Sequence, residues 1–317
     1  MNTKDFISGI LNGDRTTLSR AITLIESNLE KHQKQADEII SHCIQNSGNS
    51  IRVGITGVPG VGKSTFIEAI GKYLTNKGKK VAVLAIDPTS EKTGGSILGD
   101  KTRMNQLSID ELAFIRPSPT AGSLGGVAKK TRETIILCEA AGYEIILIET
   151  VGVGQSETLV HSMVDFFLLL MLSGAGDELQ GIKRGIMEMA DAILINKADG
   201  DNFLKAKKAK QQYKSALHLF PPTQSGWIPK VELCSAIENK NIDSAWETIE
   251  NHKSFMIKRG LFENKRKEQN LYWFHQMVKD KLLSKFYTEN SESLKQIEKE
   301  LEIGKITPSI AMEKLIM

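Results

Sequence analysis

The chain has 317 residues, of which 40% are hydrophobic and 25% are charged. These fractions are those of ordinary globular proteins, and they exclude a disordered or fibrous chain. The 41 Lys and Arg residues against 38 Asp and Glu residues give a net charge of +3. This excess is too small to indicate a nucleic-acid-binding surface.

Neither a targeting segment nor a membrane span is predicted. The first residues, MNTKDFISGI, lack the apolar core of a signal peptide, and the most apolar run, Val164–Leu172, is too short to cross a bilayer. The cysteines Cys43, Cys138 and Cys234 lie far apart and form no CxxC motif, which is typical of a reducing compartment. We therefore expect a soluble, cytoplasmic protein with neither a membrane nor a nucleic acid as partner.

The N-terminal residues are predicted to form helices. After the turn Asn12–Asp14, apolar residues recur at helical spacing at Leu18, Ile22, Ile25 and Leu29. The polar segment Asn46–Ser50 is then predicted to be a linker. We expect an N-terminal helical extension over residues 1–48.

Residues 49–255 show short apolar runs that alternate with longer amphipathic stretches. The runs predict strands at Ile51–Thr56, Val81–Ile86, Leu112–Ile115, Ile145–Glu149, Phe166–Leu172, Ala192–Asn196 and Val231–Cys234. The stretches between them predict helices at Lys63–Asn76, Lys129–Ala141, Gln180–Met189, Asn202–Leu219 and Ile242–His252. This alternation predicts an α/β fold with a doubly wound, mostly parallel sheet, whose ligands bind beyond the carboxyl ends of the strands.

Residues 256–317 are predicted to form a C-terminal helical arm. They are rich in Lys, Glu and Leu, and Gly304 and Pro308 mark a break before a final short helix. Apolar residues recur at helical spacing at Leu271, Phe274, Val278 and Leu282.

The strongest motif is a GxxxxGK[ST] pattern between the first predicted strand and the helix after it. It comprises Gly57, Val58, Pro59, Gly60, Val61, Gly62, Lys63 and Ser64, with Thr65 following. The glycines let backbone N–H groups face a polyphosphate at the positive end of the helix. We expect Lys63 to reach the β- and γ-phosphates and the Ser64 hydroxyl to bind Mg²⁺. A glycine-rich turn without a ligand is the alternative.

A second motif indicates which nucleotide base the site binds. Asn196, Lys197 and Asp199 follow a predicted strand, and the Asp199 carboxylate can accept hydrogen bonds from N1–H and the exocyclic amine of guanine. Adenine offers no such donor pair, so GTP is predicted over ATP. Asn196 can bridge to the phosphate loop, and the Lys197 stem can cover the base. Ser235 and Ala236, after the last strand, can present backbone N–H groups to the guanine oxygen.

Acidic residues at two strand ends are the candidate magnesium ligands. Asp87 and Glu149 each follow an apolar run, where a metal's water ligands are held in phosphate-loop proteins. The alternative is that each caps the following loop or helix. Gly152 is predicted to offer its N–H group to the γ-phosphate.

Three glycine-rich segments are candidate switch loops, because glycine lowers the cost of reordering: Thr93–Lys101, Gly152–Glu157 and Ser173–Glu178. Their polar side chains near a possible attacking water, and therefore the candidate catalytic residues beside Lys63, are Asp100, Gln155 and Asp177. Plain surface loops are the alternative.

Several segments closely resemble one GTPase family. They are AIDPTS, GGSILGDKTRM, ETVGVGQSE, GAGDELQGIKRGIMEMADAILINKAD and CSA. Together they resemble the methylmalonyl-CoA mutase-associated GTPases, also called MeaB/ArgK. The resemblance runs from about Ile51 to Ala236 and continues more loosely into QNLYWFHQMV and ITPSIAMEKL.

The resemblance implies a P-loop GTPase with helical extensions, which is usually a homodimer held by the C-terminal arm. It implies a G-protein chaperone that gates cofactor loading of an adenosylcobalamin-dependent mutase and protects that enzyme from inactivation. It matches Lys63 and Ser64 to the phosphate loop, Asp87 and Glu149 to the metal site, Asp100 to the first switch, Asp177 and Lys183 to a third switch, and Asn196 and Asp199 to the base. Ser173 departs from the family, which often has proline there.

The sequence leaves other functions open. A transport-associated kinase or ATPase would require adenine preference, which Asn196 and Asp199 disfavour. A metallocentre-insertion GTPase of the nickel type usually carries Cys and His metal motifs, but the histidines here are scattered. A signal-recognition GTPase would require an extra domain. The basic run from Lys205 to Lys214 is interpreted as a solvated helix face, with docking of a partner as the alternative.

Overall fold

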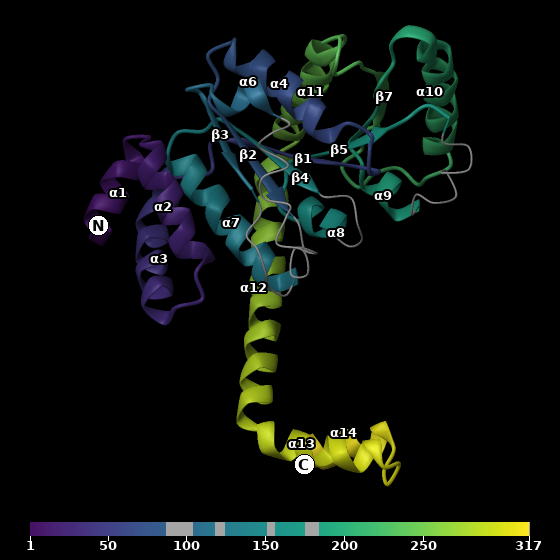
Figure 1. The fold of residues 1–317 in the computed structure, drawn as a ribbon. Coiled ribbons are helices and arrows are strands. Elements are labelled where there is room, and N and C mark those ends of the chain that lie inside the picture. Colours follow the sequence, from purple (N-terminus) through teal and green to yellow (C-terminus); the bar gives the residue numbers. More distant parts are fainter. Residues whose placement is uncertain (87–103, 118–123, 151–155, 175–183, 317) are drawn as a thin grey trace. The chain divides into compact units, whose positions relative to one another are not determined.

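The computed structural model describes residues 1–86, 104–117, 124–150, 156–174 and 184–316. Within these ranges the centre is a seven-stranded sheet of order β3-β2-β4-β1-β5-β6-β7 (Figure 1). All of its strand pairs are parallel. The strands are β1 (Ile51–Gly57), β2 (Val81–Ile86), β3 (Ala113–Arg116), β4 (Ile145–Thr150), β5 (Phe166–Met171), β6 (Ala192–Ile195) and β7 (Lys230–Leu233). The predicted doubly wound parallel sheet is confirmed, and each strand ends within one residue of its predicted bounds.

Both faces of the sheet are covered by helices, which explains why its strands read as continuous apolar runs. Leu168 of β5 packs in a core with Phe66 of α4, whereas its neighbour Leu169 packs in a second core with Tyr213 of α10. Figure 1 shows α4 and α11 on one side of the sheet and α7 and α8 on the other. The helices of this part are α4 (Lys63–Thr75), α6 (Asn105–Ser108), α7 (Leu124–Ala140), α8 (Ser156–His161), α9 (Arg184–Met189), α10 (Phe203–Leu217) and α11 (Ile242–Lys258).

The N-terminal segment forms three helices, α1 (Thr3–Leu11), α2 (Arg15–Glu26) and α3 (Glu30–Cys43). Asp14 caps α2 by accepting a hydrogen bond from the Thr17 backbone N–H. The predicted apolar positions Leu18, Ile22 and Ile25 are buried. Leu29 is the exception, because α2 ends before it and its side chain is 56% exposed.

The described chain divides into two compact units, Met1–Lys267 and Glu268–Met317. The second unit contains most of α12 (Leu261–Glu289), with α13 (Ser291–Glu302) and α14 (Pro308–Ile316), so the predicted break near Gly304 is present. Glu300 of α13 accepts hydrogen bonds from Lys314 of α14 and from Lys305 of the segment between the two helices, and these bonds lower the pKa of its carboxyl to about 2. No helix in the described ranges is long and apolar enough to span a membrane.

The three cysteines lie in different parts of the first unit. Cys43 ends α3, Cys138 lies in α7, and Cys234 follows β7; all three are free and buried. Burial raises the pKa of Cys43 to about 11 and that of Cys234 to about 12. All three side chains are therefore neutral packing groups at physiological pH.

A buried network of charges fastens the amino-terminal edge of the sheet. Arg266, in the first turns of α12, donates to both oxygens of Asp165, at 2.8 and 2.6 Å. The same guanidinium donates to the carbonyls of Gly48 and Ser50 in the predicted linker. Asp165 also accepts the backbone N–H of Arg52 at 2.8 Å. One arginine thus joins α12, the linker and the starts of two strands.

Replacing Arg266 by alanine is expected to destabilise the chain strongly. Asp165 is 2% exposed, so the substitution leaves a buried carboxylate without its ionic partner. The free energy of unfolding should fall by about 3 kcal/mol, measured by urea denaturation. Lys267→Ala is the matched control, because its exposed neighbouring side chain should change stability by less than about 0.5 kcal/mol. Equal stability of Arg266→Ala and the unmodified chain would contradict the assigned role.

Candidate nucleotide-binding site

The phosphate-loop motif lies between β1 and α4, at the carboxyl edge of the sheet. Gly57 has φ 155° and Gly62 has φ 94°, conformations that favour glycine. A Cβ atom on Gly57 would lie 2.4 Å from the Leu170 carbonyl oxygen, and one on Gly62 would lie 2.9 Å from Asn196 Nδ2. These positions therefore require glycine for two reasons, the backbone conformation and the close approach of neighbouring strands.

Lys63 and Ser64 begin α4 and are both 8% exposed. Lys63 Nζ donates to the carbonyl oxygens of Gly57, at 2.9 Å, and Val58, at 3.4 Å, so its ammonium lies inside the loop. The following Thr65 is exposed. The ammonium and the N-terminal end of a thirteen-residue helix put positive charge at one place, as binding of a polyphosphate requires.

A hydroxyl and a carboxylate meet beside the loop. Ser64 Oγ donates to Glu149 Oε1 at 3.2 Å, and Glu149, near the end of β4, is 5% exposed. Oxygen donors of these two kinds are the ligands that Mg²⁺ prefers, so the donor set fits that ion. One residue on, Thr150 Oγ1 donates to Thr56 Oγ1 at 2.8 Å and fastens β4 to β1 next to the motif.

The predicted guanine motif lies directly against the phosphate loop. Asn196 is 1% exposed and donates through Nδ2 to the Val61 carbonyl oxygen at 2.9 Å. Its Oδ1 accepts the Ala236 backbone N–H at 3.2 Å. Lys197 Nζ donates to the Gly60 carbonyl oxygen at 2.9 Å. Three loops that are far apart in the sequence therefore meet at one amide side chain.

Asp199 lies beside the last of these loops. Its Oδ2 accepts a short hydrogen bond from Ser235 Oγ, which fixes the carboxylate relative to the loop after β7. Ser235 also accepts the Glu238 backbone N–H, so its hydroxyl is itself held. Asn196, Lys197, Asp199, Ser235 and Ala236 are thus brought together, as the sequence motifs predict.

The remaining predicted residues lie outside the described ranges. These are the metal candidate Asp87, the γ-phosphate contact Gly152, and the switch or catalytic candidates Asp100, Gln155, Asp177 and Lys183. Within the described ranges no group of three or more His, Cys, Asp and Glu side chains could hold a metal ion. The residues that would position an attacking water stay predictions from the sequence.

Two features of the site were not predicted. The Thr56–Thr150 hydroxyl pair gives no motif, because isolated threonines at strand ends are common. Ser173, which departs from the family pattern, donates to Asn202 Oδ1, and Asn202 Nδ2 donates to the Lys197 carbonyl oxygen. The Thr56–Thr150 and Ser173–Asn202 contacts join residues that are 94 and 29 positions apart, so no local spacing could reveal them.

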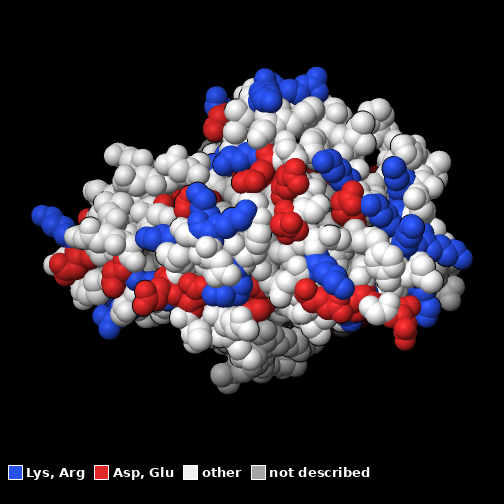
Figure 2. All heavy atoms as spheres, turned by 90° about the horizontal axis from the view of Figure 1, so that it is seen from above, with Lys and Arg blue, Asp and Glu red and all other residues white. Residues whose placement is uncertain are grey.

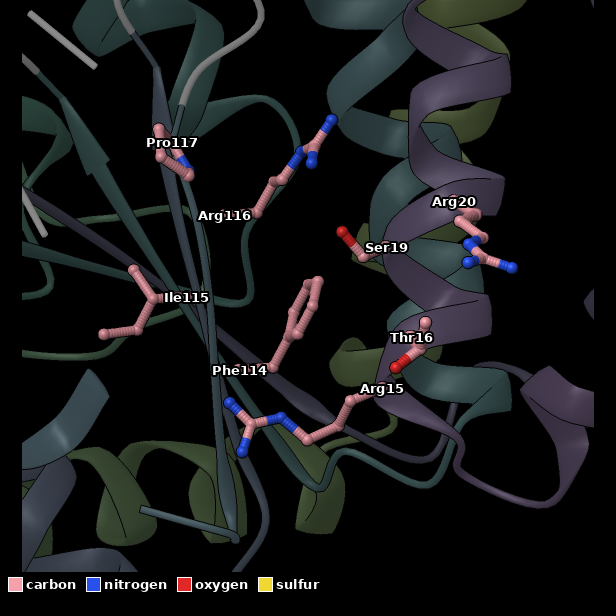
Figure 3. Close-up of a pocket in the computed structure, with 8 residues that line it drawn as sticks. All are labelled: Arg15, Thr16, Ser19, Arg20, Phe114, Ile115, Arg116 and Pro117. Atoms are coloured by element: carbon pink, nitrogen blue, oxygen red, sulfur yellow. The ribbon is translucent and has the colours of Figure 1, made fainter. Parts of the chain in front are cut away.

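Away from this site, a hollow of about 420 Å³ lies between α2 and β3. In Figure 3, Phe114 and Arg116 of β3 point toward α2, whereas Arg20 points away from the strand. Arg116 forms an ion pair with Glu26, and Arg15 donates to the Asp110 carbonyl oxygen at 3.1 Å. We interpret the hollow as a joint between the N-terminal helices and the sheet edge.

The distribution of charged side chains over the surface agrees with the small net charge of the chain. Figure 2 shows acidic and basic side chains interspersed over one face of the molecule, with basic ones gathered where α10 lies. Lys205, Lys207, Lys208 and Lys214 of α10 are exposed, while its Tyr213 is buried. The interpretation of the basic run as a solvated helix face agrees with this arrangement.

Comparison with known proteins identifies the family. The sequence model of a family described as "Methylmalonyl Co-A mutase-associated GTPase MeaB" matches residues 18–291. The chain belongs to this family. Both the resemblance found in the sequence and the prediction of a P-loop GTPase are confirmed.

Individual relatives agree with the family. A protein of Mycobacterium tuberculosis named as a probable GTPase is 47% identical over 313 residues, which cover 98% of this chain and 93% of the relative. GTPase ArgK of Escherichia coli is 48% identical over 275 residues, covering 87% and 83%. The mitochondrial methylmalonic aciduria type A homolog of mouse is 44% identical over 321 residues, covering 98% and 77%.

One solved structure matches almost the whole chain. It is described as a LAO/AO transport system kinase, and it superposes with a TM-score of 0.80 at 36% sequence identity, covering 99% of this chain and 96% of that one. The fold of that solved structure therefore extends over nearly the full length of this chain.

Replacing Asp199 by asparagine should weaken GTP binding about 100-fold, because charged hydrogen bonds to both guanine donors are lost or inverted. Binding of xanthosine triphosphate should improve, since its base presents a carbonyl where guanine has an amine. Isothermal titration with both nucleotides measures the change. Asp201→Asn, at an exposed position two residues on, is the control and should bind GTP normally. Normal GTP binding by Asp199→Asn would refute the guanine assignment.

Proposed function

We propose that this chain is a GTP-hydrolysing chaperone of an adenosylcobalamin-dependent acyl-CoA mutase, with methylmalonyl-CoA mutase as the first candidate. In this role it gates loading of the cobalamin cofactor and protects the mutase from inactivation. Family membership over residues 18–291 supports the mutase as partner. The methylmalonic aciduria type A homologs among the relatives support the same assignment.

The observation that carries the GTPase chemistry is the meeting of the phosphate loop and the guanine motif at Asn196. In the proposed complex Asp199 accepts from the base, and the Lys197 stem covers it. Lys63 and the loop N–H groups bind the β- and γ-phosphates. GTP matches both sets of contacts, because its guanine base fits the guanine motif and its triphosphate fits the phosphate loop.

Ser64 and Glu149, with Asp87, are the residues that would hold Mg²⁺. When bound, the ion supplies positive charge against the phosphate oxygens. During hydrolysis a bond forms between a water oxygen and the γ-phosphorus, and the bond to the β–γ bridging oxygen breaks. Lys63 stabilises the charge that develops on that oxygen, and Asp100, Gln155 and Asp177 are the proposed water-positioning residues.

The rival role is a transport-associated kinase or ATPase, which the name of the similar solved structure suggests. A kinase of that kind needs an adenine-binding pocket and a phosphoacceptor. The carboxylate of Asp199, fixed by Ser235 beside the loop, disfavours adenine because adenine does not offer the pair of donors that guanine presents to it. We therefore favour a GTPase that acts on a protein partner over a transport-associated kinase or ATPase.

The cysteines support a cytoplasmic location. All three are free and buried in separate parts of the first compact unit, as is typical of proteins from a reducing compartment.

We further propose a homodimer formed by the C-terminal arm, residues 256–317. Leu271, Phe274, Val278 and Leu282 recur on one face of α12 and are 61%, 60%, 39% and 62% exposed. A contiguous apolar stripe of this kind is typical of a surface that another chain covers. A second copy of this chain presents the same stripe and so offers a self-complementary partner.

Partner activation is tested by measuring GTP hydrolysis with and without purified methylmalonyl-CoA mutase. No arginine finger is evident in the sequence, so intrinsic hydrolysis should be slow and the mutase should raise it at least about tenfold. Lys63→Ala is the control, because it should bind nucleotide poorly and show no stimulation. Absence of both a complex and stimulation with this mutase, and with other acyl-CoA mutases, would refute the proposed partner class.

Dimerisation is tested by light scattering coupled to size-exclusion chromatography. Phe274→Glu places a charge within the apolar stripe and should convert a dimer to a monomer at micromolar concentration. Asp280→Lys, an exposed change on the opposite face of α12, should leave the dimer intact. A monomeric unmodified chain, or an intact dimer of Phe274→Glu, would contradict the arm as the interface.

A further inference from the structure

The Lys197 backbone in the guanine motif adopts an unusual conformation. Its φ angle is 56°, in the left-handed region, which is unfavourable for a residue with a side chain. Such a conformation persists only where surrounding contacts hold it. It directs Lys197 Nζ to the Gly60 carbonyl oxygen and precedes Asp199 by two residues, so it sets the path of the base-contacting segment.

A short relay of side chains holds this conformation. Asn202, the last residue of a 3₁₀ turn over Gly200–Asn202, donates through Nδ2 to the Lys197 carbonyl oxygen at 2.6 Å. Its backbone N–H donates to the Asp199 carbonyl oxygen at 3.0 Å. Asn202 therefore contacts the residues on both sides of Ala198 and closes the loop between them.

Ser173 is the second partner of the Asn202 amide. Ser173 Oγ donates to Asn202 Oδ1 at 2.5 Å, from the segment that follows β5. A carbonyl oxygen can only accept, so the amide nitrogen must face Lys197, and Oδ1 is left for a donor. A hydroxyl at position 173 supplies that donor. Without it the amide keeps its contact with Lys197 but loses the second contact that fixes its position.

We propose that Ser173 and Asn202 are positioning residues for guanine recognition. The relay Ser173–Asn202–Lys197 holds the loop so that the Asp199 carboxylate meets both donors of the base. Neither residue touches the nucleotide in this assignment; both act through the Lys197 backbone. The inference rests on the proposed guanine site and adds the residues that determine its selectivity.

Base selectivity is the readout that separates positioning from general stability. Inosine triphosphate lacks the exocyclic amine of guanine and so makes one of the two hydrogen bonds to Asp199. A displaced carboxylate loses more with GTP than with inosine triphosphate. A variant that only destabilises the fold would weaken both nucleotides equally.

The experiment measures dissociation constants for GTP and inosine triphosphate with the full chain. Ser173→Ala should weaken GTP binding about fivefold, the effect of one neutral hydrogen bond, and should lower the ratio of the two affinities by a similar factor. Ser173→Thr keeps the hydroxyl and should restore the ratio. Ser215→Ala, at an exposed serine of α10, is the matched control and should change neither affinity.

Asn202→Asp tests the second half of the relay. The carboxylate keeps an acceptor for Ser173 but removes the donor to the Lys197 carbonyl oxygen, so selectivity should fall at least as far as in Ser173→Ala. An unchanged GTP to inosine triphosphate ratio in both variants overturns the relay. Asp199→Asn is measured in the same assay. If that variant loses GTP selectivity while Ser173→Ala and Asn202→Asp keep it, the assignment of the guanine site stands and only the relay is rejected.

Discussion

The buried amide of Asn196 is the constraint on which the carboxyl edge of the sheet depends. Its side chain binds the phosphate loop after β1 and the loop after β7, and its backbone N–H donates to Met171 at the end of β5. A single residue at the end of β6 therefore fastens the ends of four strands. Because the partners at Val61, Ala236 and Met171 are backbone groups, these three contacts tolerate changes in neighbouring side chains, and those at Val61 and Ala236 require the amide itself.

The opposite edge is held by charge. Arg266 and Asp165 form a buried ion pair there, and Arg52 links the same region to Glu139 of α7 through a second ion pair. Buried pairs of this kind add little to stability relative to apolar packing, yet they are costly to break. They fix which segments meet: the linker before β1, the start of β5 and the first turns of α12.

Features governed by local spacing were predictable, whereas contacts across the fold were not. The apolar runs predicted every strand of the described ranges, and Gly57–Ser64 predicted the phosphate loop, because both patterns are carried by consecutive residues. Leu29 was misplaced because helical periodicity continued past a chain reversal. The Ser173–Asn202 contact spans 29 residues and joins the segments that follow β5 and β6, so only the assembled sheet brings it together.

The three buried cysteines can report local unfolding of the chain through their reaction with a thiol reagent. A thiol reagent reacts with an exposed thiolate, and each cysteine here is both covered and neutral. Cys43 reports on the N-terminal helices, Cys138 on α7, and Cys234, whose thiol donates to Asn196 Oδ1, on the nucleotide edge. The order in which the three thiols are alkylated under mild denaturant would therefore show the order in which these three regions unfold. No label has to be introduced for this measurement.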